Sequence, residues 1–187
     1  LLLPAPLLSG DAAVRPGPAR SATGACNFAG VAGAWAHVGA DAVWGRLAAL
    51  PNYYFGTPSG RGRVATVAAW DESQAWHDAL MRRLAANRDV VGEWAAAHPS
   101  GLRCVVPEAT YLAWIDFAGT GIAAGPAAAI LERGRVMLNA GADFSRHTSV
   151  GTTTFARLNF ATDEVVLGGV LAGIDRARAL ATVLPDD

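Results

Sequence analysis

The chain has 187 residues, 52% of them hydrophobic, and a formal net charge of −1 at pH 7. This length suits one domain of ordinary size, or a small domain with part of another, and the nearly balanced charge excludes a protein that binds nucleic acid through a basic surface. No apolar run approaches the roughly 20 residues that a membrane-spanning helix needs, so a cytoplasmic protein is expected. All fifteen basic residues are arginine, and lysine is absent from the sequence.

The N-terminal part of the sequence predicts a strand and a short helix after an irregular start. Residues 1–20 are rich in Pro, Gly and Ala, and we expect a poorly ordered lead-in there. Residues 30–39 alternate small, apolar and polar side chains, which predicts a buried strand. Apolar residues recur at helical spacing over 41–50, and Pro51 ends that predicted helix because proline cannot continue the hydrogen-bond ladder.

The strongest periodic pattern predicts one long helix from Asp71 to Ala97. Asp71 is placed to cap it, with Gln74 three residues later as in a capping box, and apolar residues then recur on one face. Pro99 ends the pattern. Residues 52–62, which precede the helix, are interpreted as a loop that carries aromatic side chains.

After this helix the sequence predicts a mixture of strands and helices. The predicted strands are 102–106, 111–117 and 155–160, and the predicted helices are 127–133 and 163–180, the last capped by Thr162 or Asp163. We place a domain boundary within the long helix, near residue 95. An α/β fold with a small C-terminal α+β domain is therefore expected.

Several familiar chemistries are excluded because their motifs are missing. The sequence has no glycine-rich dinucleotide fingerprint, and a Walker motif requires lysine. Residues 56–60 miss the hydrolase nucleophile pattern by one position. The two cysteines, Cys26 and Cys104, have neither metal-site spacing nor that of a disulfide framework, and the four histidines form no ligand pair, so no metal site is predicted.

Three stretches carry a more specific pattern. They are 21–30 (SATGACNFAG), 107–116 (PEATYLAWID) and 155–162 (FARLNFAT), the last preceded by VMLNAG at 136–141. Their order and spacing resemble the C-terminal half of pyridoxal-phosphate (PLP) enzymes of the class I/II aminotransferase fold. The closest branch is the cystathionine β-lyase, or cysteine-S-conjugate β-lyase, group.

The resemblance runs from about Ser21 to Ala179 and implies a fold of type I. It implies that residues 21–95 are a remnant of the large cofactor-binding domain with its linking helix. Residues 96–187 are then the small C-terminal α+β domain.

Arg157 is the candidate for substrate binding. Alternation along a strand puts Arg157 on the same face as Phe155 and Asn159. A guanidinium among apolar neighbours requires an anion, which its planar fork can bind bidentately. From the residues alone, the anion is either a ligand carboxylate or a structural ion-pair partner, Asp116 or Asp143. The resemblance implies that Arg157 binds the α-carboxylate of an amino-acid substrate.

The resemblance also implies that Ser21 and Thr23 hold the phosphate of PLP, although two hydroxyls can instead cap a turn. In the family a lysine follows these hydroxyls and binds the cofactor aldehyde, whereas this sequence has Gly24 at that position. Glycine offers neither an amine nor an acid–base group. We therefore assign no catalytic residue and do not expect covalent binding of PLP.

Three functions follow from these observations. The first is a truncated or degenerate relative of a PLP-dependent C–S β-lyase or aminotransferase that acts on amino acids but is inactive alone. The second is a non-catalytic partner subunit that lends Arg157 or the aromatic residues 53–56 to a lysine-bearing relative. The third is a binding module of the same fold. The resemblance implies a dimer, either of two identical chains or with that lysine-bearing relative.

Overall fold

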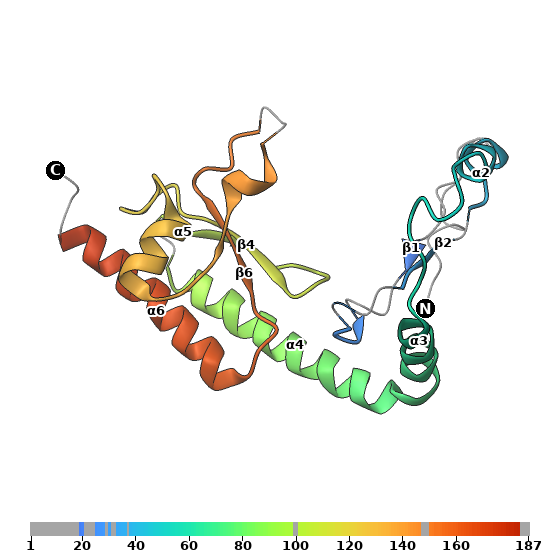
Figure 1. Ribbon diagram of the computed structural model, residues 1–187. Coiled ribbons are helices and arrows are strands. Elements are labelled where there is room, and N and C mark those ends of the chain that lie inside the picture. Colours follow the sequence, from blue (N-terminus) through green and yellow to red (C-terminus); the bar gives the residue numbers. More distant parts are fainter. Residues whose placement is uncertain are drawn as a thin grey trace. The chain divides into compact units, whose positions relative to one another are not determined.

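The computed structural model describes residues 19–20, 25–28, 30, 33–36, 38–98, 101–146 and 150–183. The lead-in predicted over 1–20 lies almost wholly outside these residues. The chain divides into two compact units, Leu1–Ala79 and Leu80–Asp187, and each is described by itself (Figure 1). No helix in the described part of the chain is long and apolar enough to cross a membrane.

In its described residues the first unit has two very short strands, the helices α2 and α3 and the start of α4, but almost no core. Strand β1 (Ala19–Arg20) pairs antiparallel with β2 (Trp35–Ala36), and helices α2 (Asp41–Ala48) and α3 (Gly60–Glu72) follow. The strand predicted over 30–39 is reduced, among the described residues, to β2, while the helix predicted over 41–50 is confirmed as α2. Only Ala40 and Gly62 are buried in the described part of this unit.

The long helix predicted from Asp71 to Ala97 is wrong at its start, because the structure has two helices there. Helix α3 ends at Glu72, Ser73 follows, and α4 runs over Gln74–Ala96. Asp71 therefore belongs to the last turn of α3 and does not cap α4. The Ser73 hydroxyl donates to the carbonyl of Ala69, a local bond that competes with continuation of the helix.

Helix α3 begins where the sequence predicts the end of a loop. Its first turn is stabilised by Ser59, whose hydroxyl oxygen accepts a hydrogen bond from the backbone N–H of Gly62 at 2.8 Å. Gly60 and Gly62 lie inside this turn and have low helix propensity, which explains why the sequence pattern missed it.

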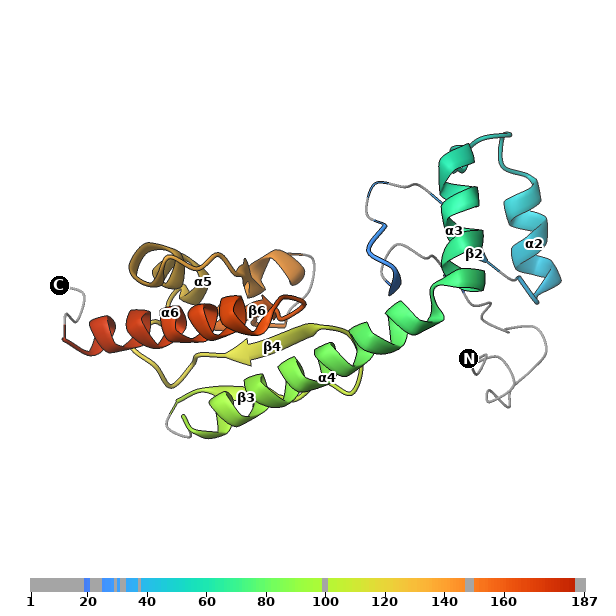
Figure 2. The same ribbon diagram turned by 90° about the horizontal axis from the view of Figure 1, so that it is seen from below.

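The second unit is a four-stranded antiparallel sheet with helices on one face (Figure 2). The strand order is β3 (Arg103–Val105), β4 (Leu112–Asp116), β6 (Phe155–Asn159), β5 (Asn139–Ala140). The predicted strands over 102–106, 111–117 and 155–160 are confirmed. Strand β5 has two residues, too few for a sequence pattern, and was not predicted.

The helices of the second unit follow the sequence prediction closely. Helix α5 (Pro126–Ala129) continues into a π-helical turn, η3 (Ile130–Gly134), and a 3₁₀ turn, η4 (Gly141–Phe144), follows β5. The last helix is α6 (Glu164–Val183). Of the two predicted caps it uses Asp163, whose carboxylate accepts from the backbone N–H of Val166 at 2.9 Å.

Strand alternation builds the core of this unit. Ala113 and Ile115 of β4 and Ala156 and Leu158 of β6 are at most 2% exposed, all on one face. Helical residues in the same buried cluster are Val91, Ala95, Ile130, Leu167, Leu171, Ile174 and Ala177. The opposite face of the sheet, which carries Arg157, is thus left outside the core.

Along the sequence, the boundary between the two units lies between Ala79 and Leu80, whereas the sequence pattern predicts a boundary near residue 95. Most of α4 lies in the second unit because Val91 and Ala95 pack into its core. Helix α4 is also tied to α6 by Asp175, which accepts from Trp94 Nε1 at 3.0 Å and lies 3.3 Å from His98 Nε2. His98 thus takes part in the contact with α6.

A buried amide joins α4 to the end of β6. Asn87 is 2% exposed, and its Nδ2 donates to the backbone carbonyls of Phe160 and Thr162, each at 2.8 Å. A buried polar side chain is stable only when its hydrogen bonds are made, and these two bonds fix the point where the chain leaves the sheet.

We expect Asn87→Leu to lower the free energy of unfolding of the second unit by about 1–3 kcal/mol, because both hydrogen bonds from the buried amide are lost. Urea unfolding of the full chain, followed by far-UV circular dichroism, measures this. The control is Ala86→Leu on the exposed side of α4, which should change the free energy by less than about 0.5 kcal/mol. Equal losses in both variants would contradict a role for the two hydrogen bonds.

Candidate functional site

The outward face of the sheet is organised around Arg157. In the register of the sheet, Arg157 on β6 lies between Trp114 on β4 and Asn139 on β5. The prediction that Arg157 shares a face with Phe155 and Asn159 is confirmed, because the residues between them are buried in the core.

Three observations describe the Arg157 guanidinium. Its Nη2 donates to the side-chain oxygen of Asn139 at 3.1 Å, and its Cζ lies 4.3 Å from the ring centroid of Phe144. Its Nε is buried and has no hydrogen-bond partner within the described residues. A buried N–H without a partner costs about 1–3 kcal/mol, so the group is poised to gain from an incoming acceptor.

The two carboxylates considered as structural partners of Arg157 are engaged elsewhere. Asp116 accepts from the hydroxyl of Thr154 at 2.8 Å, and Asp143 pairs with Arg146 at 2.5 Å. Neither forms an ion pair with Arg157 in the described part of the chain. Among the described residues the structural ion-pair alternative therefore has no support, and none of their carboxylates compensates the charge of the guanidinium.

Aromatic rings line the same face. Trp114 stacks on Phe155 with centroids 5.5 Å apart and an interplanar angle of 19°. Trp114 also meets the edge of Phe144, again at 5.5 Å, with an angle of 80°. Phe144 gives Arg157 a cation–π contact. The rings also give it an apolar surround, and the lower dielectric there strengthens its attraction for an anion.

The 3₁₀ turn η4 brings Phe144 to Arg157, and the turn can approach β6 only because residue 141 is glycine. A Cβ on Gly141 would lie 2.2 Å from the carbonyl oxygen of Thr152 and 2.7 Å from Cβ of Phe155. The Thr152 hydroxyl also donates to the Gly141 carbonyl at 2.8 Å. Phe144 and Asn139 are site residues that the sequence reasoning did not single out, because their roles depend on this tertiary contact.

The other site residues predicted from the sequence, Ser21, Thr23 and Gly24, lie outside the described residues. Among the described ones, no group of three His, Cys, Asp or Glu side chains gathers as metal ligands. Burial raises the pKa of the Cys104 thiol, so little reactive thiolate forms near neutral pH.

We expect Gly141→Ala to destabilise the second unit by about 1–3 kcal/mol, because the new methyl group overpacks the contact with β6. The same change should move Phe144 away from Arg157 and alter the near-UV circular dichroism of Trp114. Gly151→Ala is the matched control, since a Cβ at Gly151 meets nothing within 4 Å. An unchanged urea midpoint for Gly141→Ala would show that this close approach is not required.

The chain was compared with protein families and with known proteins. No family model matches the chain. A cystathionine β-lyase of Corynebacterium glutamicum is 40% identical over 100 residues, which cover 54% of this chain and 25% of that protein. A Mycobacterium leprae protein, named provisionally as a cystathionine β-lyase, is 33% identical over 170 residues, covering 84% of this chain and 41% of its own length.

A solved structure gives the same result for the fold. It is the crystal structure of a PLP-dependent β-cystathionase, also named provisionally, from Corynebacterium diphtheriae. The likeness has a TM-score of 0.76 at 27% identity and covers 87% of this chain and 42% of that chain. The chain thus spans less than half the length of the relatives it matches.

The residues present do not fit a PLP cofactor that is held through a side-chain amine, because the 187-residue sequence contains no lysine. The architecture nevertheless agrees with the expectation from the sequence. The chain has the α/β fold of PLP-dependent fold type I proteins, and its homologues and structural neighbours are PLP-dependent proteins of the cystathionine β-lyase and aminotransferase fold.

Proposed function

We propose that this chain is a catalytically incomplete relative of the PLP-dependent C–S β-lyases, which binds the α-carboxylate of an amino acid through Arg157 but performs no lyase or aminotransferase chemistry alone. The observation that carries the proposal is the buried Nε–H of Arg157, which has no partner within the described residues. A carboxylate is the ligand that satisfies this group best, since two oxygens match the fork of the guanidinium.

The surroundings of Arg157 favour such a ligand. Asn139 contacts one edge of the guanidinium and Phe144 contacts one face. Because the group is already held in place, binding of a ligand costs less conformational entropy. Asp143, the acidic side chain of the adjacent turn, is neutralised by Arg146 and does not compete for the cation.

The inactivity of the isolated chain follows in this proposal from the chemistry of the cofactor. PLP enzymes of this kind bind the aldehyde through a lysine amine, which then moves protons at the substrate's α-carbon. We assign Gly24 to the corresponding position, and no residue of the sequence has an amine side chain. Ser21 and Thr23 can offer the phosphate only hydroxyl groups.

The second candidate function is that of a non-catalytic partner subunit, either in a homodimer or with a lysine-bearing relative. The nearly absent core of the first unit favours it, because a unit that buries only Ala40 and Gly62 among its described residues gains stability from a partner. Recovery of such a relative in a complex with the chain purified from its source would favour this function. A cytoplasmic location stays a prediction from the sequence.

We expect L-cystathionine to shift the Nε–H resonance of Arg157 in nitrogen-15 NMR spectra of the full chain. Arg157→Gln should weaken binding about tenfold or more, because charge-assisted hydrogen bonds to the carboxylate are lost. Arg82→Gln, which removes an exposed arginine of helix α4, is the control and should bind as the wild type does. Equal binding of an amino-acid amide that lacks the carboxylate would rule out this role for Arg157.

We also expect that PLP, added to the chain and fixed with borohydride, will label only the terminal α-amino group. Any imine absorption band that develops before reduction should come from the terminal α-amino group alone, since the sequence offers no lysine amine. Peptide mass mapping locates the label, and a PLP-dependent enzyme of the same fold serves as the positive control. A labelled internal peptide would refute the proposed lack of covalent cofactor binding.

A further inference from the structure

A row of side chains runs across the outward face of the sheet from Arg157. In the register of the sheet, Arg157 on β6 lies opposite Trp114 on β4, and Trp114 lies opposite Val105 on β3. Neighbouring strands are about 4.8 Å apart, so the row from Arg157 to Val105 spans roughly 10 Å. Arg157 is the charged member of this row, and the other two members are apolar.

The apolar part of the row is poorly covered. Val105 is 84% exposed, and Phe144, whose ring contacts the guanidinium, is 48% exposed. Trp114 is half-buried against the rings of Phe144 and Phe155. Apolar side chains gain free energy when water is removed from them. A ligand that is held at Arg157 and carries an apolar group along the row would therefore gain affinity from it.

The acidic residue in the neighbouring row is directed away from Arg157. Oδ1 of Asp116 accepts from the hydroxyl of Thr154 at 2.8 Å and from the backbone N–H of Ala118 at 2.9 Å. Both donors lie beyond the pair that Asp116 forms with Phe155 in the sheet register, on the side away from Arg157. The carboxylate of Asp116 is thus held away from an ammonium group that would accompany a carboxylate at Arg157.

Two acceptors closer to Arg157 are already used. Asp143 pairs with Arg146 of its own turn. The side-chain oxygen of Asn139 accepts from Arg157 itself. An α-ammonium group next to Arg157 would meet the positive guanidinium without a counter-charge from these side chains, and like charges repel.

We propose that the ligand of Arg157 is a carboxylate with an apolar body, which lies over Trp114 toward Val105, and that an α-amino group adds nothing to its binding. This inference rests on the proposed function, because it requires carboxylate binding at Arg157, and it names the class of ligand. Arylalkanoic acids such as 3-phenylpropanoate have this chemistry. Two methylene groups place the phenyl ring about one strand spacing from the carboxylate, over Trp114.

A dicarboxylate fits this face less well. Arg103 is the basic residue of β3 on the same face, and it lies opposite Asp116 in the register of the sheet. Opposite charges at directly opposed positions of two strands offset each other. A second carboxylate would therefore meet little net positive charge at Arg103, whereas an apolar group meets Trp114 and Val105.

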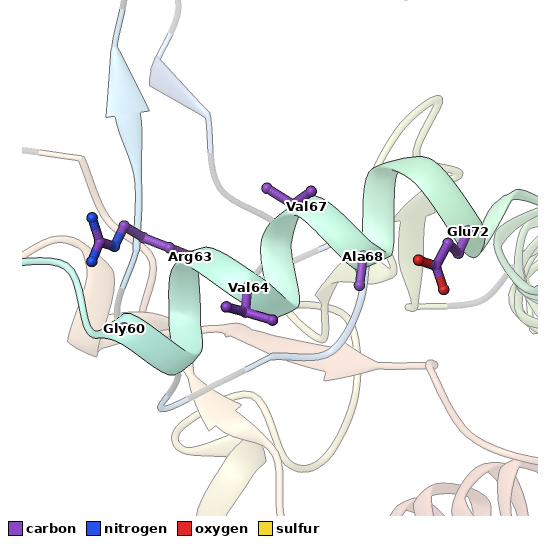
Figure 3. Close-up of a pocket in the computed structure, with 6 residues that line it drawn as sticks. All are labelled: Gly60, Arg63, Val64, Val67, Ala68 and Glu72. Carbon is purple, nitrogen blue, oxygen red and sulfur yellow. The ribbon is translucent and has the colours of Figure 1, made fainter.

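The exposed apolar surface of the first unit has no comparable cation. It borders a groove along α3, and Figure 3 shows the residues that line it, which are Gly60, Arg63, Val64, Val67, Ala68 and Glu72. This groove has one basic and one acidic side chain, and both are exposed. Solvated charges gain little from a partner, whereas the Nε–H of Arg157 is buried and has no partner among the described residues. The face of Arg157 is thus the one that selects an anion.

The test is a nitrogen-15 NMR titration of the full chain, which follows the Arg157 Nε–H and the indole N–H of Trp114. 3-Phenylpropanoate should shift both resonances and bind at least as tightly as L-phenylalanine, because the ammonium group has no counter-charge. Acetate, which has no apolar body, should bind about tenfold more weakly and shift Arg157 alone. 2-Phenylethylamine has the ring and the amine but no carboxylate, and it should shift neither resonance.

A variant separates the apolar contact from the carboxylate contact. Val105→Asp should weaken binding of 3-phenylpropanoate about threefold or more, because a charge then lies beside the ring, and should leave acetate within about twofold. Val165→Asp is the matched control, since Val165 is an 85% exposed valine on α6, which packs on the other face of the sheet. It should change the binding of neither ligand.

The outcomes distinguish this inference from the proposed function. If neither L-cystathionine nor any other carboxylate shifts the Arg157 resonance, both fail. If L-phenylalanine binds and 3-phenylpropanoate does not, or if acetate binds as tightly as 3-phenylpropanoate, carboxylate binding at Arg157 stands and the choice of an apolar body is overturned. Tighter binding of the dicarboxylate adipate than of 3-phenylpropanoate, or an unchanged affinity in Val105→Asp, would also overturn it.

Discussion

Alternation along strand β6 is the constraint on which the second unit depends. Successive side chains of a strand point to opposite faces, so the same five residues must satisfy a dry core and an open surface. Ala156 and Leu158 are at most 2% exposed and join β6 to the buried cluster of α4 and α6. Arg157 between them is forced to the other face, outside the core. The core therefore fixes the position of the Arg157 side chain.

Once Arg157 is on that face, its orientation depends on contacts that come from distant parts of the chain. Asn139 holds one edge of the guanidinium and Phe144 covers one side, and both belong to the segment around β5 and η4. Gly141 allows that segment to lie against β6. The result is a cation in an aromatic surround, with a buried N–H that has no partner among the described residues. Such a group has little use in stabilising the fold, which is why we connect it with a ligand.

The two units differ in how much of their stability they supply themselves. The second has a continuous core and buried links such as Asn87, which hold sheet and helices together without help. The first buries only Ala40 and Gly62 among its described residues and exposes valine and aromatic side chains along α2 and α3.

The sequence by itself determined the strands β4 and β6, the helix α6 and the face of Arg157, because these depend on local periodicity and on a cap such as Asp163. It also determined that the 187 residues offer no lysine amine. It could not locate the break at Ser73, where a hydroxyl bond to Ala69 interrupts a continuous helical pattern. Nor could it place Phe144 and Asn139 beside Arg157, or show that Asp116 and Asp143 have other partners. Those contacts join residues far apart in the chain, and only the packing of the sheet decides which of them meet.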